Sequence, residues 1–159
     1  RHTGPALSPF NAWVLLKGLE TLSVRVNYSN ASALRVAEFL EDHPAVRWVR
    51  YPFLPSHPQH DLAKRQMSGG GTVVTFELEA PEGAGKQRAF EVLDKLSLID
   101  ISNNLGDSKS LITHPATTTH RAMGPEGRAA IGLGDGVVRI SVGLEGTEDL
   151  IADLDRALS

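Results

Sequence analysis

The sequence predicts a single α/β domain, built as an open sheet with helices packed on one side. Segments with the spacing of amphipathic helices alternate with a few short segments that have the apolar pattern of strands. The 159 residues have the length of one ordinary domain, and 41% hydrophobic and 22% charged residues are normal for a globular core. No internal repeat or low-complexity linker divides the chain.

Two helices are expected at the start of the chain. Ser8 followed by Pro9 is typical of a helix N-terminus, with serine as the cap and proline at the first helical position. Apolar residues then recur at helical spacing and predict one face: Leu15, Leu19, Leu22 and Val26. A second helix, expected to end before Pro44, has its own apolar face: Ala33, Ala37 and Leu40. We interpret residues 1–42 as a helical connector and residues 43–159 as an α/β core.

The rest of the chain alternates between strands and helices. Strands are expected at residues 46–51, 72–78, 98–101 and 137–142. In the second strand Val74, Phe76 and Leu78 should face the core, because successive side chains of a strand point to opposite faces. Helices are expected at residues 61–66, 86–96 and 125–130, followed by a final helix capped by Thr147. The polar, turn-rich segment 102–123 is interpreted as a functional loop region.

Composition argues against several classes of protein. The net charge is -3 and the pI about 6.1, without the basic stripe that a nucleic-acid partner would require. No apolar stretch is long enough to span a bilayer. The absence of cysteine excludes disulfides and thiolate metal sites, and it fits the reducing compartment of a cytoplasmic protein.

The first four residues (RHTG) contain neither an initiator methionine nor a signal-peptide pattern. Because this opening runs directly into a patterned helix, we expect a soluble piece whose upstream sequence is missing. A tag remnant is the alternative.

Arg139 is the most informative candidate for a binding residue in the sequence. It interrupts an apolar strand in which Val138, Ile140 and Val142 share one face, while Arg139 and Ser141 share the other. A guanidinium in such a strand is unfavourable unless an anion satisfies it, and its planar fork matches a carboxylate through two parallel hydrogen bonds. The alternative is an arginine that is exposed to solvent or paired with an Asp or Glu of the chain.

Other polar and glycine-rich segments have simpler explanations. Residues 103–107 (NNLGD) could present amide groups to a polar ligand, but asparagine and glycine are also ordinary turn residues. The glycine runs at 69–71 and 132–136 precede strands rather than helices, which argues against a phosphate site. The six histidines lack a metal-binding spacing, and the five lysines lack a context that favours a Schiff base.

Four stretches nevertheless resemble, in the same order, the C-terminal domain of the Cys/Met-metabolism family of pyridoxal-phosphate (PLP) enzymes. They are residues 7–13 (LSPFNAW) with 18–22 (GLETL), 104–111 (NLGDSKSL), 114–120 (HPATTTH) and 138–145 (VRISVGLE). Together they are strongly specific and extend over essentially the whole chain. The resemblance implies an open mixed, partly antiparallel sheet with helices on one side, like the small C-terminal domain of fold-type I PLP enzymes.

The resemblance also implies roles for three residues. Arg139 matches the arginine that binds the α-carboxylate of the amino-acid substrate. Asn104 matches a residue that helps to hold the same carboxylate, and asparagine there is similar to the sulfhydrylase branch. Thr119 matches a threonine that supports this carboxylate site.

The family's cofactor site is implied to lie elsewhere. The lysine that holds PLP, and the residues that bind its phosphate and ring, belong to a large domain that is absent from this chain. The resemblance therefore implies PLP in the parent enzyme, with no cofactor and no catalytic residue in residues 1–159.

The N-terminal stretch is most similar to family members that join sulfide to O-succinylhomoserine, giving homocysteine and succinate in methionine biosynthesis. Such a parent would be a transferase and a homotetramer at full length. A domain of a cystathionine γ-synthase, or of a methionine or cystathionine γ-lyase, is the alternative within the family. A stand-alone amino-acid-binding or interaction module is the alternative outside it.

Overall fold

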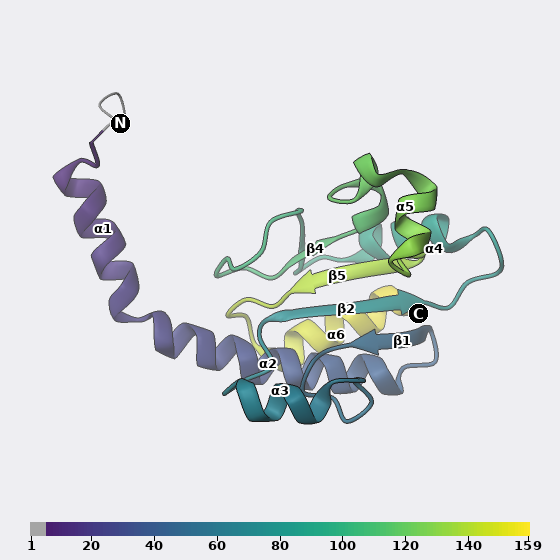
Figure 1. Ribbon diagram of the computed structural model, residues 1–159, viewed down its shortest axis with the longest axis horizontal. Helices are drawn as coiled ribbons and strands as arrows, with labels where there is room; N and C mark the ends of the chain where they lie inside the picture. The colour runs from purple at the N-terminus through teal and green to yellow at the C-terminus, as the bar shows by residue number, and fades with distance from the viewer. Residues whose placement is uncertain (1–5) are drawn as a thin grey trace.

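The computed structural model describes residues 6–159 (Figure 1). Its elements are, in order, α1 (Pro9–Glu20), α2 (Leu22–Asp42), β1 (Val46–Arg50), α3 (His60–Gln66), β2 (Val73–Leu78), α4 (Gly85–Lys95), β3 (Asp100–Ile101), β4 (Leu111–Thr113), the 3₁₀ turns η1 (Pro115–Thr117) and η2 (Arg121–Met123), α5 (Gly124–Ala130), β5 (Val137–Ser141) and α6 (Thr147–Leu158). Residues 1–4, on which the expectation of missing upstream sequence rests, lie outside the described residues.

Five strands form one mixed sheet in the order β1-β2-β5-β4-β3. All neighbouring pairs are antiparallel except β3 and β4, which are parallel. The central strand β5 places Arg139 opposite Thr75 of β2 on one side and Thr113 of β4 on the other. The predicted open, partly antiparallel sheet is therefore confirmed.

The core lies on the helix-covered face of this sheet. Val74, Phe76 and Leu78 are buried as predicted, and they pack in one cluster with Val138 and Ile140 of β5. Figure 1 shows α6 behind the strands. The helices α2, α4 and α6 add apolar residues to the same cluster: Val36, Leu40, Val92, Leu150 and Leu154. Burying such side chains stabilises the fold by about 1.5–3 kcal/mol each. Within residues 6–159, none of the helices is long and apolar enough to cross a membrane.

The second half of α2 is part of this core. Ala33, Val36, Ala37 and Leu40 have no exposed surface, since they face the sheet at helical spacing. The division of the chain at residue 42 into a connector and a core stays a prediction.

One predicted helix boundary is wrong. The helical face through Leu22 and Val26 was expected to continue the first helix, but α1 ends at Glu20 and α2 begins at Leu22. Arg25 spans the break, since its Nη2 donates to the carbonyl of Gly18 (2.6 Å) and its Nε donates to the hydroxyl of Thr21 (3.3 Å). The bond to Gly18 gives a partner to a main-chain carbonyl in the last turn of α1, where carbonyls lack partners within the helix.

Three further predictions need correction. The segment 102–123 is not a loop throughout, since it contains β4 and two 3₁₀ turns; a strand of three residues is too short for a periodic pattern to reveal. Gly146, not Thr147, is the N-cap of α6, because the Thr147 hydroxyl lies 2.8 Å from the Ser32 hydroxyl and bonds to α2 instead. The strand expected at 98–101 is reduced to Asp100–Ile101.

Helix α1 extends away from the body of the molecule and buries none of its residues (Figure 1). Its apolar side chains are exposed on every side of the helix, among them Trp13, Leu15, Leu16 and Leu19, the last with 62% of its surface exposed. Leu15, Leu19 and Leu22, which the sequence places on one helical face, are all exposed. A helix that is apolar on all sides is normally buried, so we expect the exposed surface of α1 to be covered by other protein surface.

We predict that the 159-residue chain self-associates and binds a hydrophobic dye through α1. Replacing Leu15 and Leu19 by Gln should reduce dye fluorescence and shift the chain towards the monomer in sedimentation experiments, because it removes two exposed apolar side chains. Lys17→Gln on the same helix is the matched control and should change neither. A wild-type chain that is monomeric and binds no dye would contradict the prediction.

Asp153 on α6 holds the chain after α4 in place. Its buried carboxylate accepts hydrogen bonds from three successive backbone N–H groups, those of Ser97, Leu98 and Ile99, and it pairs with Arg156. Burial by itself would raise the pKa of Asp153, but the backbone N–H groups outweigh it and the pKa is lowered.

A depressed pKa means that Asp153 stabilises the fold above the ordinary Asp pKa of about 4 and that this stability is lost as the pH falls through the folded pKa. Asp153→Asn should lower the free energy of unfolding by about 2 kcal/mol at pH 7. The difference from wild type should shrink in urea titrations near pH 3. The exposed Asp94→Asn is the control, and a difference that does not depend on pH would contradict the assignment.

Candidate functional site

Arg139 lies in the middle of β5 and points to the face of the sheet that is opposite the core. Its Nη2 donates a hydrogen bond to the main-chain carbonyl of Asn103 (2.9 Å). Its Nε is buried and has no hydrogen-bond partner. Among residues 6–159, no Asp or Glu forms an ion pair with it, so an internal carboxylate does not account for the charge. Because a buried N–H group without a partner is unfavourable, this arrangement favours an anion that the chain does not itself supply.

The loop over Arg139 presents Asn104. The neighbouring Asn103 receives the Arg139 hydrogen bond, and the N–H of Gly106 donates to the hydroxyl of Ser141, two residues further along β5 (3.0 Å). The Asn104 side chain is exposed between these two contacts, while its N–H donates to Ser102 Oγ (3.3 Å). The structure thus brings the loop that carries Asn104 against Arg139, although the two residues are far apart in the sequence.

The far end of this loop is fixed by the turn that follows β5. Glu145 accepts hydrogen bonds from the N–H (2.7 Å) and the hydroxyl (2.8 Å) of Ser110, and that hydroxyl accepts from the N–H of Gly143 (2.9 Å). The N–H of Leu144 donates to the Ser108 carbonyl (2.8 Å). Every second residue of the stretch from Arg139 to Glu145 therefore contacts the loop at 103–110.

Gly143 is required by this close approach. A Cβ there would lie 2.5 Å from the Ser108 carbonyl oxygen and 2.6 Å from the Ser110 nitrogen, and both are main-chain atoms that cannot turn away.

We predict that Gly143→Ala lowers the free energy of unfolding by about 1–3 kcal/mol, because the added methyl group overpacks the junction. Gly18→Ala, which adds the same group to open space within α1, should be neutral or slightly stabilising. Urea unfolding of the two variants tests this, and equal stabilities would show that the junction has room for a side chain at position 143.

Thr119 is less directly placed. Its hydroxyl lies 2.8 Å from Nδ1 of His120, and no hydrogen bond joins it to Arg139 in the described part of the chain. Thr113, the register neighbour of Arg139, bonds through its hydroxyl to that of Thr118 (2.9 Å). Thr118, which sequence reasoning did not select, is thus the threonine that contacts the strand beside Arg139.

The buried histidine of this region has a structural role. In the His114 ring, Nδ1 lies 2.9 Å from Thr117 Oγ1, and Nε2 lies 2.8 Å from the carbonyl oxygen of Asp135. Both ring nitrogens are therefore occupied. Over residues 6–159, no group of three His, Asp or Glu side chains is placed to hold a metal ion.

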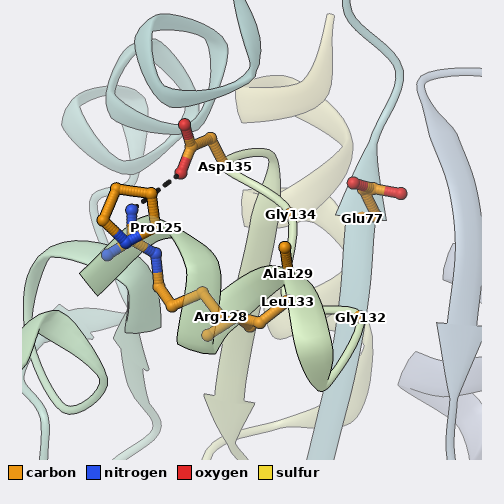
Figure 2. Close-up of a pocket in the computed structure, with 8 residues that line it drawn as sticks. All are labelled: Glu77, Pro125, Arg128, Ala129, Gly132, Leu133, Gly134 and Asp135. Atoms are coloured by element: carbon orange, nitrogen blue, oxygen red, sulfur yellow. Dashed lines mark ion pairs between the residues drawn. The ribbon is translucent and has the colours of Figure 1, made fainter. Parts of the chain in front are cut away.

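A hollow of about 390 Å³ lies between α5, the turn at 132–135 and Glu77 of β2 (Figure 2). Figure 2 shows Arg128 reaching from α5 toward Asp135, with 3.6 Å between Nη2 and Oδ1, while Glu77 stands across from them on β2. The Glu77 carboxylate accepts a hydrogen bond from the indole N–H of Trp48 (2.6 Å). Sequence reasoning missed this hollow, because the charged residues that line it come from three separate segments.

Comparisons with known proteins identify the family. The model of the Cys/Met metabolism PLP-dependent enzymes matches residues 1–159, so the chain belongs to this family. It is 84% identical over its whole length to an O-succinylhomoserine sulfhydrylase of Mycobacterium tuberculosis and 46% identical over 156 residues to an L-methionine gamma-lyase of Porphyromonas gingivalis. It spans 39% and 38% of the lengths of these relatives.

The same family relation appears in the structure. A Campylobacter jejuni crystal structure that contains N'-pyridoxyl-lysine-5'-monophosphate superposes with a TM-score of 0.89 and 41% identity, covering 99% of this chain and 37% of that one. The predicted resemblance, the fold class and the dependence of the family on PLP are confirmed.

The described residues do not fit a covalent PLP site. A Schiff-base lysine is normally desolvated, yet all five lysines of the chain are exposed. Lys17 pairs with Glu20 (3.0 Å) and Lys109 with Asp100 (2.9 Å), which raises the pKa of Lys109 rather than lowering it. No step of the chemistry is therefore assigned to a lysine of this chain.

Proposed function

We propose that this chain is the substrate-carboxylate-binding C-terminal domain of a PLP-dependent O-succinylhomoserine sulfhydrylase. The observation that carries the proposal is the guanidinium of Arg139, whose Nε is buried without a partner beside the loop that presents Asn104. The 84% identity to an O-succinylhomoserine sulfhydrylase supports the choice of reaction.

The role of Arg139 follows from its geometry. Its position on a central strand limits its movement, so a carboxylate bound there is held at a fixed place relative to the sheet. A guanidinium binds a carboxylate through two parallel hydrogen bonds, which fixes orientation as well as position. Such fixed orientation is a large part of catalysis in cofactor enzymes, where the protein aligns the substrate with the cofactor.

Asn104 and Thr119 complete the proposed carboxylate site. The Asn104 amide, exposed at the tip of the loop, would donate to the same carboxylate. Thr119, in the turn that follows β4, is included because it matches the family's supporting threonine, and its hydroxyl lies 2.8 Å from His120 Nδ1.

The reaction of the parent enzyme would replace the succinate of O-succinylhomoserine by sulfide and release homocysteine. When bound, PLP supplies the electron sink for this chemistry. Because the lysines of this chain are exposed, the lysine that holds PLP is proposed to lie in the part of the parent that these 159 residues do not include. We accordingly propose that the chain by itself is inactive and that the parent is a cytoplasmic homotetramer.

A γ-lyase is the second candidate, favoured by the 46% identity to an L-methionine gamma-lyase. Incubating the full-length protein with sulfide and O-succinylhomoserine, with methionine, and with cystathionine separates the reactions. Homocysteine formed only from the first mixture supports the sulfhydrylase. α-Ketobutyrate formed from methionine would instead support the lyase.

We predict that Arg139→Ala in the full-length enzyme lowers kcat/KM for O-succinylhomoserine by about two to three orders of magnitude, because one partner of a charged, bidentate contact is lost. Arg47→Ala is the matched control, since Arg47 is an exposed arginine that pairs with Glu79 on the outer strand β1. Steady-state kinetics on both variants tests the role. Near-normal kinetics for Arg139→Ala would refute it.

A further inference from the structure

Two residues on the same face of β5 hold the loop that presents Asn104. Arg139 donates to the Asn103 carbonyl (2.9 Å), and Ser141 accepts from the Gly106 N–H (3.0 Å). The two contacts enclose only Asn104 and Leu105, whose side chains are exposed. The tip of the loop is therefore positioned by two hydrogen bonds from one strand.

These two hydrogen bonds differ in what they leave for a ligand. Arg139 keeps one buried N–H without a partner, so its guanidinium has a donor left for an incoming carboxylate in addition to its bond to Asn103. Ser141 is 99% buried and contacts no open surface, so its bond to Gly106 persists whether or not a ligand is bound. Gly106 has a φ of +80°, a conformation that suits glycine and gives the chain a sharp bend at this contact.

The next fixed points of the loop lie beyond Gly106. The Ser108 carbonyl and the Ser110 side chain bond to the turn at 144–145, while Asp107 is exposed and its carboxylate turns back to the Lys109 N–H (3.3 Å). Ser141 is thus the last fixed contact before Asn104 on this side of the loop.

We propose that Ser141 is a positioning residue for carboxylate recognition: its hydroxyl fixes Gly106 and thereby keeps Asn104 beside Arg139. The proposal rests on the proposed function, since it takes Arg139 and Asn104 as the carboxylate site. Ser141 itself contacts no substrate. Its removal should therefore reduce selectivity for a carboxylate and leave the cofactor chemistry in place.

The test compares two inhibitors of the full-length enzyme that differ only at the carboxyl group, L-2-aminobutyrate and its amide. The ratio of their inhibition constants measures carboxylate recognition by itself. Wild type should prefer the carboxylate, and Ser141→Ala should reduce this preference about fivefold, as expected for the loss of one hydrogen bond. Ser141→Thr, which keeps the hydroxyl, should restore the preference. A merely structural role would weaken both inhibitors equally.

Ser32→Ala is the matched control, because it also deletes a buried serine hydroxyl, one that bonds to Thr147 rather than to the loop. It should leave the ratio at the wild-type value. If Ser141→Ala does not fold, Ser141→Val and Ser141→Thr make the same comparison, since they have nearly the same shape and differ in the hydroxyl. The Gly106 amide should also exchange with deuterium faster in Ser141→Ala than in wild type.

The outcomes separate the two proposals. A wild-type ratio in Ser141→Ala, or unchanged exchange at Gly106, overturns the role of Ser141 alone. A wild-type ratio in Arg139→Ala overturns the carboxylate site itself, and with it the proposed function. Loss of the preference in Arg139→Ala together with a partial loss in Ser141→Ala supports both.

Discussion

The junction between the end of β5 and the loop at 103–110 is the interaction on which the candidate site depends. Ser110 is fully buried, and its hydroxyl both donates to Glu145 and accepts from Gly143. A buried polar network of this kind is favourable only when each member has its partner, so it fixes a single arrangement of the two segments. The loop that presents Asn104 is therefore as well placed as the strand to which it is bonded.

The same junction ties the helical layer to the site. The hydroxyl of Ser29 on α2 donates to the main-chain carbonyl of Gly143 (2.7 Å), and the hydroxyl of Tyr28 donates to the main-chain carbonyl of Glu145 (3.2 Å). Helix α2 thus contacts the turn that fixes the loop, while its buried apolar residues belong to the core. Fold and site are connected at this point, because one short turn after β5 satisfies hydrogen-bonding groups from helix α2 and from the loop.

Arg139 lies on a rigid central strand, but its guanidinium has an incomplete set of hydrogen-bond partners. Its strand is central, yet its guanidinium has a buried N–H that the described residues leave without an acceptor. Helix α1 is incomplete in another sense, because its apolar side chains are exposed on all sides. Under the proposed function, a substrate carboxylate would complete the first feature and protein surface would cover the second.

The amino-acid sequence by itself determined the fold class and most of the helices and strands, because strict alternation, as in Val74, Phe76 and Leu78, and helical spacing, as in Ala33, Ala37 and Leu40, report burial directly. It also marked Arg139, since a charge in an apolar strand is visible in the order of residues. Only the tertiary structure decided that Asn103 and Gly106 are the contacts of β5, that Ser141 is a buried acceptor and that Thr118 rather than Thr119 bonds beside Arg139. Those contacts join residues far apart along the chain, and local periodicity carries no information about which distant groups will share a hydrogen bond.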